Sequence, residues 1–325
     1  MVIGYFLSTE EYGPDELLEQ AVLAEEAGFE ALAISDHFHP WNDEQGQSAF
    51  VWSVIGALAK VSRLPVTTTV TCPTVRMSPV ITAQAAATSA ALHHGGFRLG
   101  VGSGEALNEH IHGDRWPTAE IRLEMLEEAV DVMRRLWTGE RVDHHGKHYT
   151  VEDARIYTLP ETPPEIYVSG FGPAATKLAA RIGDGYVTTT ADAELLDLFR
   201  TESGGKPAIA TIKAAYAPTE EEAVGHAHRL WSTSGLPGEL AQVLASPKQF
   251  EQGAQLVTEE MTRNAHVCGP DLQRHAEAFD DYASFEEVYV ANIGPHYAEM
   301  IRRFGEEVLP AVRKTRALTR DGGGG

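Results

Sequence analysis

The stretch Ala31-Leu-Ala-Ile-Ser-Asp-His-Phe-His-Pro-Trp41 decides how this chain is interpreted. Its first four residues are apolar, which is typical of a buried strand, and polar and aromatic side chains follow at residues 35–41. In an α/β barrel the catalytic groups lie at the carboxyl ends of the strands. A strand that ends in Asp, His and Trp is therefore a candidate for the centre of an enzyme site.

Apolar, strand-like runs alternate with helical patterns on both sides of this stretch. Repeated β–α units with apolar strands predict a parallel sheet, and eight of them predict a closed (β/α)8 TIM barrel of the α/β class. The first helix shows the expected asymmetry, with Pro14 near its start and Gly28 just past its end. The eight expected strands are at residues 2–7, 31–35, 65–72, 97–102, 165–169, 185–190, 208–216 and 287–291.

Two insertions interrupt this rhythm. Residues 140–164 are rich in His, Tyr, Thr and Pro, and residues 232–270 are expected to place helical pieces over the barrel mouth. We predict a single barrel domain over residues 1–315. The segment 316–325 ends in four glycines and is expected to be a disordered tail.

Composition limits the class of protein. The 325 residues carry a formal net charge of −21, which argues against nucleic-acid binding, and 43% are apolar, enough for a large core. No run approaches the roughly 18 apolar residues of a membrane span, and no signal peptide is evident. Two cysteines, Cys72 and Cys268, suggest reduced thiols in a chain of this size. We expect a cytoplasmic protein with a small-molecule substrate and no nucleic-acid or membrane partner.

Histidine motifs favour proton transfer over metal binding. Histidine is the side chain best suited to exchange a proton near neutrality, which makes His37 a candidate catalytic residue. The alternative is that residues 35–41 only cap the strand, and the neighbouring Asp36 and Trp41 favour the catalytic interpretation. The clusters at residues 37–39 and 144–148 also suggest metal ligands. Neither cluster has a carboxylate or cysteine at a recognised spacing, so the sequence predicts no metal site.

Glycine-containing turns follow two other expected strands. Residues 100–105 resemble a dinucleotide loop, but Glu105 takes the place of the third glycine. We interpret this segment as a tight turn that brings backbone and one carboxylate to a flat ligand, with Asn108 in reach. Residues 169–175 combine a strand end, a glycine turn and a helix that opens at Pro173, which would expose N–H groups to a phosphate. An ordinary barrel turn is the alternative interpretation.

Together these segments resemble the luciferase-like barrel superfamily, and within it the branch related to coenzyme F420-dependent glucose-6-phosphate dehydrogenase. The resemblance covers nearly the whole chain. It implies a homodimeric barrel that binds a deazaflavin, which transfers hydride through its ring carbon C5. The motifs that carry it are residues 35–41, 100–109, 136–142, 167–173 and 183–185.

The resemblance also implies roles for individual residues. The family's catalytic histidine falls on His37, which would deprotonate the substrate hydroxyl. Its catalytic glutamate falls on Glu105, which would protonate N1 of the reduced deazaflavin, and its tryptophan falls on Trp41, which would wall the pocket and stabilise the intermediate. The family's cis peptide would fall between Thr69 and Val70. Cofactor contacts would fall on Asp36, Val70, Cys72, Ser103, Gly104, Asn108, Phe171, Gly172, Ala174 and Ala175.

The sequence departs from the family pattern at the expected substrate site. The family's glucose 6-phosphate site uses a threonine, two lysines and an arginine. The threonine falls on Thr189, but the lysine positions fall on Asp192 and Gln252, and the arginine position lies near residues 263–264. Losing two cations and gaining a carboxylate disfavours a phosphate. A family threonine at the cofactor is also replaced, by Cys72, whose thiol is a weaker donor.

We therefore predict a coenzyme F420-dependent oxidoreductase that interconverts an alcohol, such as a non-phosphorylated sugar, and its carbonyl product. An FMN-dependent luciferase-like monooxygenase is the alternative among enzymes. A non-catalytic cofactor-binding barrel is the alternative outside them. The set of His37, Trp41 and Glu105 argues against the last, because a carrier needs no proton-transfer groups.

Overall fold

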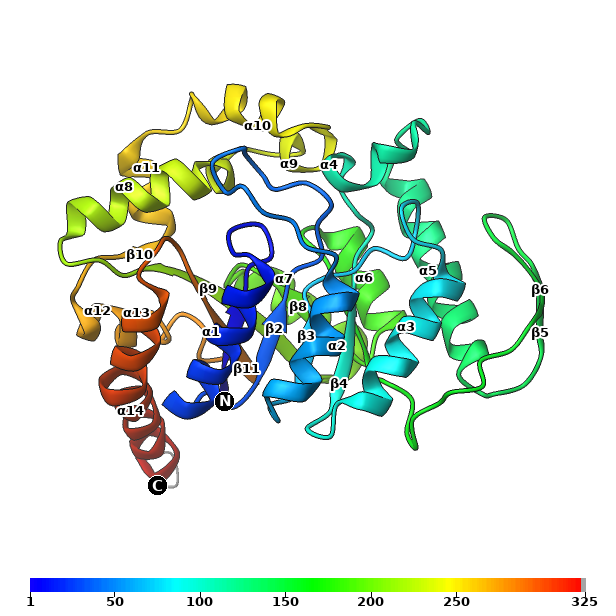
Figure 1. Ribbon diagram of the computed structural model, residues 1–325, viewed down its shortest axis with the longest axis horizontal. Helices are drawn as coiled ribbons and strands as arrows, with labels where there is room; N and C mark the ends of the chain where they lie inside the picture. Colours follow the sequence, from blue (N-terminus) through cyan, green and yellow to red (C-terminus); the bar gives the residue numbers. More distant parts are fainter. Residues whose placement is uncertain (323–325) are drawn as a thin grey trace.

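Eight parallel strands close into a barrel in the computed structural model, which describes residues 1–322 (Figure 1). The strands follow one another around the cylinder as β9-β11-β1-β2-β3-β4-β7-β8, and the pairing of β8 with β9 closes it. The predicted (β/α)8 TIM barrel is thus confirmed. The strands are β1 (Val2–Leu7), β2 (Leu32–Ile34), β3 (Val66–Thr68), β4 (Phe97–Val101), β7 (Ile166–Ser169), β8 (Gly185–Thr188), β9 (Ala208–Ala215) and β11 (Glu287–Asn292).

Helices cover the outside of the barrel and bury the outer faces of its strands. Tyr5 and Leu7 of β1 are completely buried within the large core cluster that includes these helices, whereas Phe6 faces a second cluster inside the barrel. Burial on both faces explains why the strands are continuous apolar runs without alternation. The covering helices are α1 (Pro14–Ala27), α2 (Val51–Val61), α3 (Pro79–Leu92), α5 (Ala119–Leu136), α6 (Pro173–Ile182), α7 (Ala193–Ser203), α8 (Glu220–Trp231), α12 (Leu272–Glu277), α13 (Tyr297–Arg303) and α14 (Leu309–Gly322).

An ionic network joins several strands inside the barrel. The guanidinium of Arg98 on β4 makes two bonds to the carboxylate of Glu287 on β11, at 2.8 and 2.5 Å. It also donates to Thr67 on β3 and to the hydroxyl of Tyr289, and it lies 4.9 Å from the ring centroid of Tyr167 on β7. One side chain therefore links four strands.

The insertion at residues 140–164 contains an antiparallel hairpin of β5 (Val142–His145) and β6 (Thr150–Ala154), which projects from one side of the barrel (Figure 1). The sequence indicated an insertion here but no strands. Two of the three hairpin histidines contact α5: His144 pairs with Glu128 at 2.9 Å, and His148 pairs with Glu124 at 3.2 Å.

The second insertion covers the carboxyl ends of the strands (Figure 1). It contains a 3-10 segment (Ser232–Gly235), α9 (Leu240–Val243), α10 (Pro247–Ala254) and α11 (Glu259–Ala265), followed by β10 (Val267–Cys268) beside β9. Phe250 of α10 packs edge-on against Trp41, with ring centroids 5.1 Å apart. The expected helical cover is therefore present.

The end of the chain continues as α14 through Gly322. The tail predicted to be disordered spans residues 316–325. Residues 316–322 of it belong to α14, and residues 323–325 lie outside the described residues. Within residues 1–322, no helix has both the length and the apolar character needed to cross a membrane.

Candidate active site

His37 lies at the carboxyl end of the barrel between two carboxylates. Its Nε2 is 3.3 Å from Oε1 of Glu10, which follows β1, and 3.9 Å from Oε1 of Glu105, which follows β4. The ring of Trp41 lies against it, with centroids 5.0 Å apart. The sequence-predicted trio of His37, Trp41 and Glu105 is therefore brought together. Because Glu10 is 3% exposed and Glu105 is 22% exposed, the second carboxylate is the one that a ligand can reach more easily.

Asn108 orients both His37 and Glu105. Its Oδ1 accepts hydrogen bonds from the backbone N–H groups of Phe38 and His39, at 2.8 and 3.0 Å. This fixes the amide so that Nδ2 donates to Glu105 and lies 3.0 Å from Nδ1 of His37. The carbonyl of His39 is a second partner for the same Nδ1, at 3.2 Å. When Nδ1 accepts from Asn108, the ring proton is on Nε2. When Nδ1 donates to the His39 carbonyl, the ring proton is on Nδ1. Nε2 faces Glu10 in both neutral tautomers.

Glu10 is held in place by Ser35. The hydroxyl of Ser35 donates to Oε2 of Glu10 at 2.6 Å and accepts from the backbone N–H of Thr9 at 3.0 Å. The pairing of β1 with β2, which sets Leu7 opposite Ile34, brings these two strand ends side by side. A buried carboxylate therefore faces His37 from a strand other than its own.

Asp36 points away from His37, as expected for the next residue along an extended chain. Its carboxylate accepts from the hydroxyl of Thr71 at 2.7 Å and from Arg76 at 2.8 Å. Arg76 also binds Glu109 through its backbone N–H, at 2.7 Å, and its side chain. Burial raises the pKa of Glu109 to about 7, although the bonds from Arg76 oppose this shift. The three ionic groups form a buried bridge among the loops after β2, β3 and β4.

The ends of β3 and β4 lie very close together. The predicted cis peptide between Thr69 and Val70 is present. A side-chain Cβ on Gly102 would lie 2.8 Å from Val70 and 3.9 Å from Cys72, so only glycine permits this approach. Burial raises the pKa of the Cys72 thiol well above its usual value, which keeps the thiol neutral. Val70 and Cys72 therefore adjoin the predicted turn that leads to Ser103 and Gly104.

The predicted phosphate turn opens α6. Gly172 is the N-cap residue of α6, and no side chain caps the helix there. Backbone N–H groups of the first turn can therefore bind an anion. Ala174 is exposed and Ala175 half-buried, while Phe171 is 54% exposed. Tyr186 of the adjacent β8 donates to the carbonyl of Gly170 at 2.5 Å and holds the turn.

A second ionisable cluster lies beside Glu10. Burial raises the pKa of Glu11 to about 7, and burial lowers the pKa of Lys213 on β9 to about 8. Trp231 separates these two groups: its Nε1 donates to Glu11 at 2.5 Å, and the Lys213 ammonium lies 3.5 Å from its ring centroid. Such a contact is a cation–π interaction.

The predicted substrate residues are more dispersed. Thr189 is exposed just beyond β8, and no hydrogen bond joins it to His37, Glu10 or Glu105 within residues 1–322. Asp192 caps α7 by accepting from the backbone N–H of Leu195 at 3.0 Å. Gln252 is exposed on α10, and Arg263 forms an ion pair with Glu220 of α8.

A family model described as luciferase-like monooxygenase matches residues 1–286 of the chain. This chain belongs to the luciferase-like monooxygenase family. The relatives include two named F420-dependent glucose-6-phosphate dehydrogenase. The one from Microbacterium testaceum (strain StLB037) is 36% identical over 327 residues, covering 96% of this chain and 97% of the relative. The one from Kribbella flavida is 35% identical, covering 96% of this chain and 98% of the relative.

A solved structure is similar to this luciferase-like barrel over almost all of its length. It is an F420-dependent secondary alcohol dehydrogenase in complex with an F420–acetone adduct, with a TM-score of 0.89 and 31% identity. The alignment covers 96% of this chain and 98% of that one.

Several site residues of this luciferase-like chain were not found from its sequence. Glu10 carried a usable signal, because Ser8–Glu11 is a polar cluster directly after an apolar strand, as residues 35–41 are. Arg76 and Glu109 lie outside such positions, and their role in the bridge to Asp36 appears only when three loops meet. Lys213 sits within a strand whose side chains are otherwise small or apolar, which is itself an unusual place for a cation.

Proposed function

We propose that this protein is a coenzyme F420-dependent oxidoreductase that interconverts an alcohol and its carbonyl product. The observation that carries the proposal is the position of His37 Nε2 between Glu10 and the more accessible Glu105. Removing a hydride from an alcohol carbon requires a base for the hydroxyl proton, and a neutral imidazole braced by a carboxylate is such a base. The names of the relatives and of the similar structure support the same reaction class.

The residues at the carboxyl end suit a phosphate-bearing deazaflavin. The uncapped start of α6 offers N–H groups to an anion, and Gly102 and Gly104 let a flat ring approach the backbone after β4. On this proposal Val70, Cys72, Ser103 and Asn108 would hold the ring, and residues 171–175 would hold the phosphate. The chemistry that F420 supplies when bound is the acceptance and donation of hydride at a ring carbon.

The protein's own residues then handle two protons. His37 accepts the hydroxyl proton at Nε2 when its Nδ1 donates to the His39 carbonyl, and Glu10 stabilises the resulting imidazolium. Glu105, oriented by Asn108, would supply the proton that balances the uptake of hydride by the cofactor. Trp41, backed by Phe250, limits the access of water to His37.

We further propose that the substrate is an uncharged alcohol, such as a non-phosphorylated sugar. Asp192 and Gln252 carry no positive charge, and Arg263 is paired with Glu220, so none of these three side chains offers an unpaired cation to a phosphate. This proposal is tested by comparing glucose 6-phosphate with glucose and simple secondary alcohols. A kcat/KM for glucose 6-phosphate above that of every uncharged alcohol would contradict it.

The central experiment combines His37→Ala with cofactor titration. We expect the wild-type protein to bind F420 in preference to FMN and to turn over an alcohol, and the variant to lose about 10²–10⁴-fold in kcat while keeping its affinity for F420. His145→Ala is the matched control, because His145 is exposed on the distant β5. Preference for FMN would support a monooxygenase instead. Retained turnover in His37→Ala would exclude the role of His37.

We also propose a cytoplasmic homodimer. Light scattering on the purified protein measures the assembly directly, and a particle mass near the 35.3 kDa of one chain would contradict the dimer. Fractionation of the source cells, with recovery in the cytoplasmic fraction as the expected result, tests the location.

A further inference from the structure

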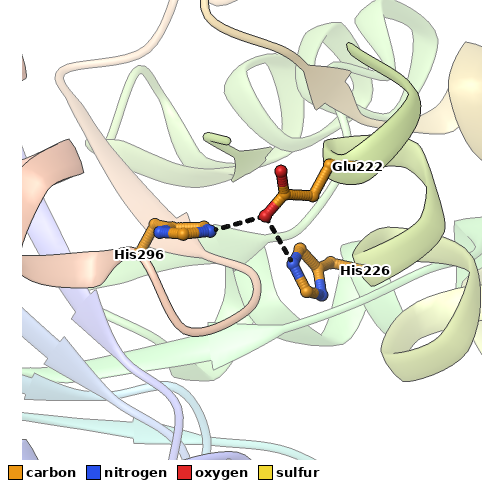
Figure 2. Close-up of side chains that lie close together, drawn as sticks. All are labelled: Glu222, His226 and His296. Atoms are coloured by element: carbon orange, nitrogen blue, oxygen red, sulfur yellow. Dashed lines mark hydrogen bonds and ion pairs between the residues drawn. The ribbon is translucent and has the colours of Figure 1, made fainter. Parts of the chain in front are cut away.

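Two histidines and a glutamate meet on the surface away from the proposed catalytic centre. Glu222 and His226 are four residues apart on α8, so both project from the same side of the helix. His296, in the turn between β11 and α13, faces them across a short gap (Figure 2). The Oε1 of Glu222 lies 3.0 Å from Nε2 of His296 and 3.6 Å from Nε2 of His226, and the three ligand atoms all lie within 4.8 Å of one another.

The cluster is not satisfied by its own hydrogen bonds. His296 bonds directly to Glu222, but the 3.6 Å separation leaves His226 Nε2 beyond hydrogen-bond distance. This nitrogen is buried from solvent and has no hydrogen-bond partner within residues 1–322. A buried ring nitrogen that faces a carboxylate oxygen, without a hydrogen-bond partner among the described residues, is the observation that points to a ligand.

The backbone holds the two sides of the cluster against each other. Gly294 has a φ of +89°, and a Cβ at this position would lie 3.2 Å from Cβ of His226. Only glycine therefore lets this turn lie so close to α8. The turn is also held by the loop after β1, because its Gly294 N–H donates to Glu11 at 2.7 Å and its carbonyl accepts from Tyr12 at 2.7 Å.

The charges around the cluster favour a cation. Glu222 contributes a carboxylate to the cluster, and its side chain is 41% exposed. Glu221 precedes it in the first turn of α8, whereas the neighbouring Glu220 is already paired with Arg263 and Arg274. Arg229 contacts the cluster directly: it lies 3.4 Å from Nδ1 of His226 and bonds to Glu44 at 3.0 Å. Its contact is with the other ring nitrogen, so Nε2 of His226 still faces Glu222.

We propose that Glu222, His226 and His296 bind a divalent transition-metal ion, with Zn²⁺ the representative. Two imidazoles and one carboxylate are ligands that such ions prefer, and one position is left for water. Bonds of about 2.0–2.1 Å would bring the ligand atoms to about 3.3 Å from one another, which small side-chain rotations achieve. The ion would join α8 to the turn after β11 and so stabilise both. The sequence did not reveal this site because His296 lies far along the chain from α8.

Titration of tag-free, metal-stripped protein tests the proposal. We expect calorimetry with Zn²⁺ to show one equivalent bound, a higher thermal midpoint with Zn²⁺ than without, and visible absorption bands on addition of Co²⁺. The variants Glu222→Gln and His296→Ala should each weaken Zn²⁺ binding by more than about tenfold.

Matched controls separate this site from adventitious binding. Glu221→Gln removes one carboxylate from the neighbouring position on α8, and His145→Ala removes an exposed histidine on β5. Both should bind Zn²⁺ as the wild type does. Wild-type binding weaker than millimolar would overturn the proposal. Equal affinities for the wild type, Glu222→Gln and His296→Ala would overturn it as well. Activity with an alcohol plays no part in these readouts.

Discussion

Two adjacent glutamates at the end of β1 differ in what they contact. Glu10 turns towards His37 and Ser35, whereas Glu11 accepts hydrogen bonds from Trp231 and from the backbone of Gly294. Burial raises the pKa of Glu11 from 4.5 to about 7, and the two hydrogen bonds only partly oppose this. The folded protein therefore holds this proton more tightly than the unfolded chain does.

This difference predicts how stability depends on pH. Because the folded state binds the Glu11 proton more tightly, the contribution of Glu11 lowers the free energy of unfolding as pH rises from about 4.5 to about 7, by at most about 3 kcal/mol. In Glu11→Gln this pH-dependent part should disappear. The variant should also have a lower free energy of unfolding at every pH. Its single amide oxygen can accept a good hydrogen bond from Trp231 or from the Gly294 N–H, but not from both. Urea unfolding from pH 5 to pH 7.5 measures both effects.

The comparison must be made as a difference from the wild type, because Glu109 also has a pKa raised to about 7 by burial and is unchanged in the variant. Glu26→Gln, at an exposed position of α1, is the control and should follow the wild-type curve. If the curves of Glu11→Gln and the wild type stay parallel over this range, Glu11 does not titrate as its burial implies.

At the scale of elements, the turn from β4 into α4 (Ala106–Glu109) depends on Gly104, whose φ is +83°. A Cβ there would also lie 2.9 Å from Cγ of Glu109. Gly104→Ala should lower the free energy of unfolding by about 1–2 kcal/mol and weaken cofactor binding, because it displaces the adjacent Glu105. Urea denaturation and cofactor titration measure the two effects.

Gly225 is the matched control for this substitution. It lies within α8, and a Cβ there would meet nothing within 4 Å. Gly225→Ala should raise the free energy of unfolding by about 0.5–1 kcal/mol, since alanine is favoured over glycine in a helix. Two alanine variants of equal stability would contradict the strain assigned to Gly104.

The barrel strands could be predicted from sequence because each is a short apolar run buried on both faces. The β5–β6 hairpin could not, because its alternation is broken by polar residues such as Asp143 and His144 that bond to neighbouring elements.

For the site, residues 35–41 identified His37 and Trp41. The contact of His37 with Glu10 depends on the register of β1 against β2, which no local pattern records.

At the scale of the whole molecule, Arg98 ties four strands together inside the barrel. Burial alone would raise the pKa of Glu287. The pKa is nevertheless lowered, because Arg98 donates two hydrogen bonds to its carboxylate. Arg98→Ala would leave this carboxylate buried without its partner. We expect the free energy of unfolding to fall by about 3–5 kcal/mol, as measured by urea denaturation.

An exposed ion pair supplies the comparison. The side chains of Arg134 and Asp184 are 44% and 36% exposed. Arg134→Ala should cost less than about 1 kcal/mol, because solvent screens such pairs. A loss in Arg98→Ala no larger than in Arg134→Ala would show that the network inside the barrel does not hold the strands together.

The covering segment at residues 232–270 has an evolutionary consequence. The residues assigned to proton transfer all come from the first four β–α units, whereas this cover is inserted near the end of the chain and reaches them through Phe250. Recombination among homologous genes could therefore exchange the cover and leave the proton-transfer residues intact. A lineage built in this way can diversify the molecules it accepts while it inherits a single reaction.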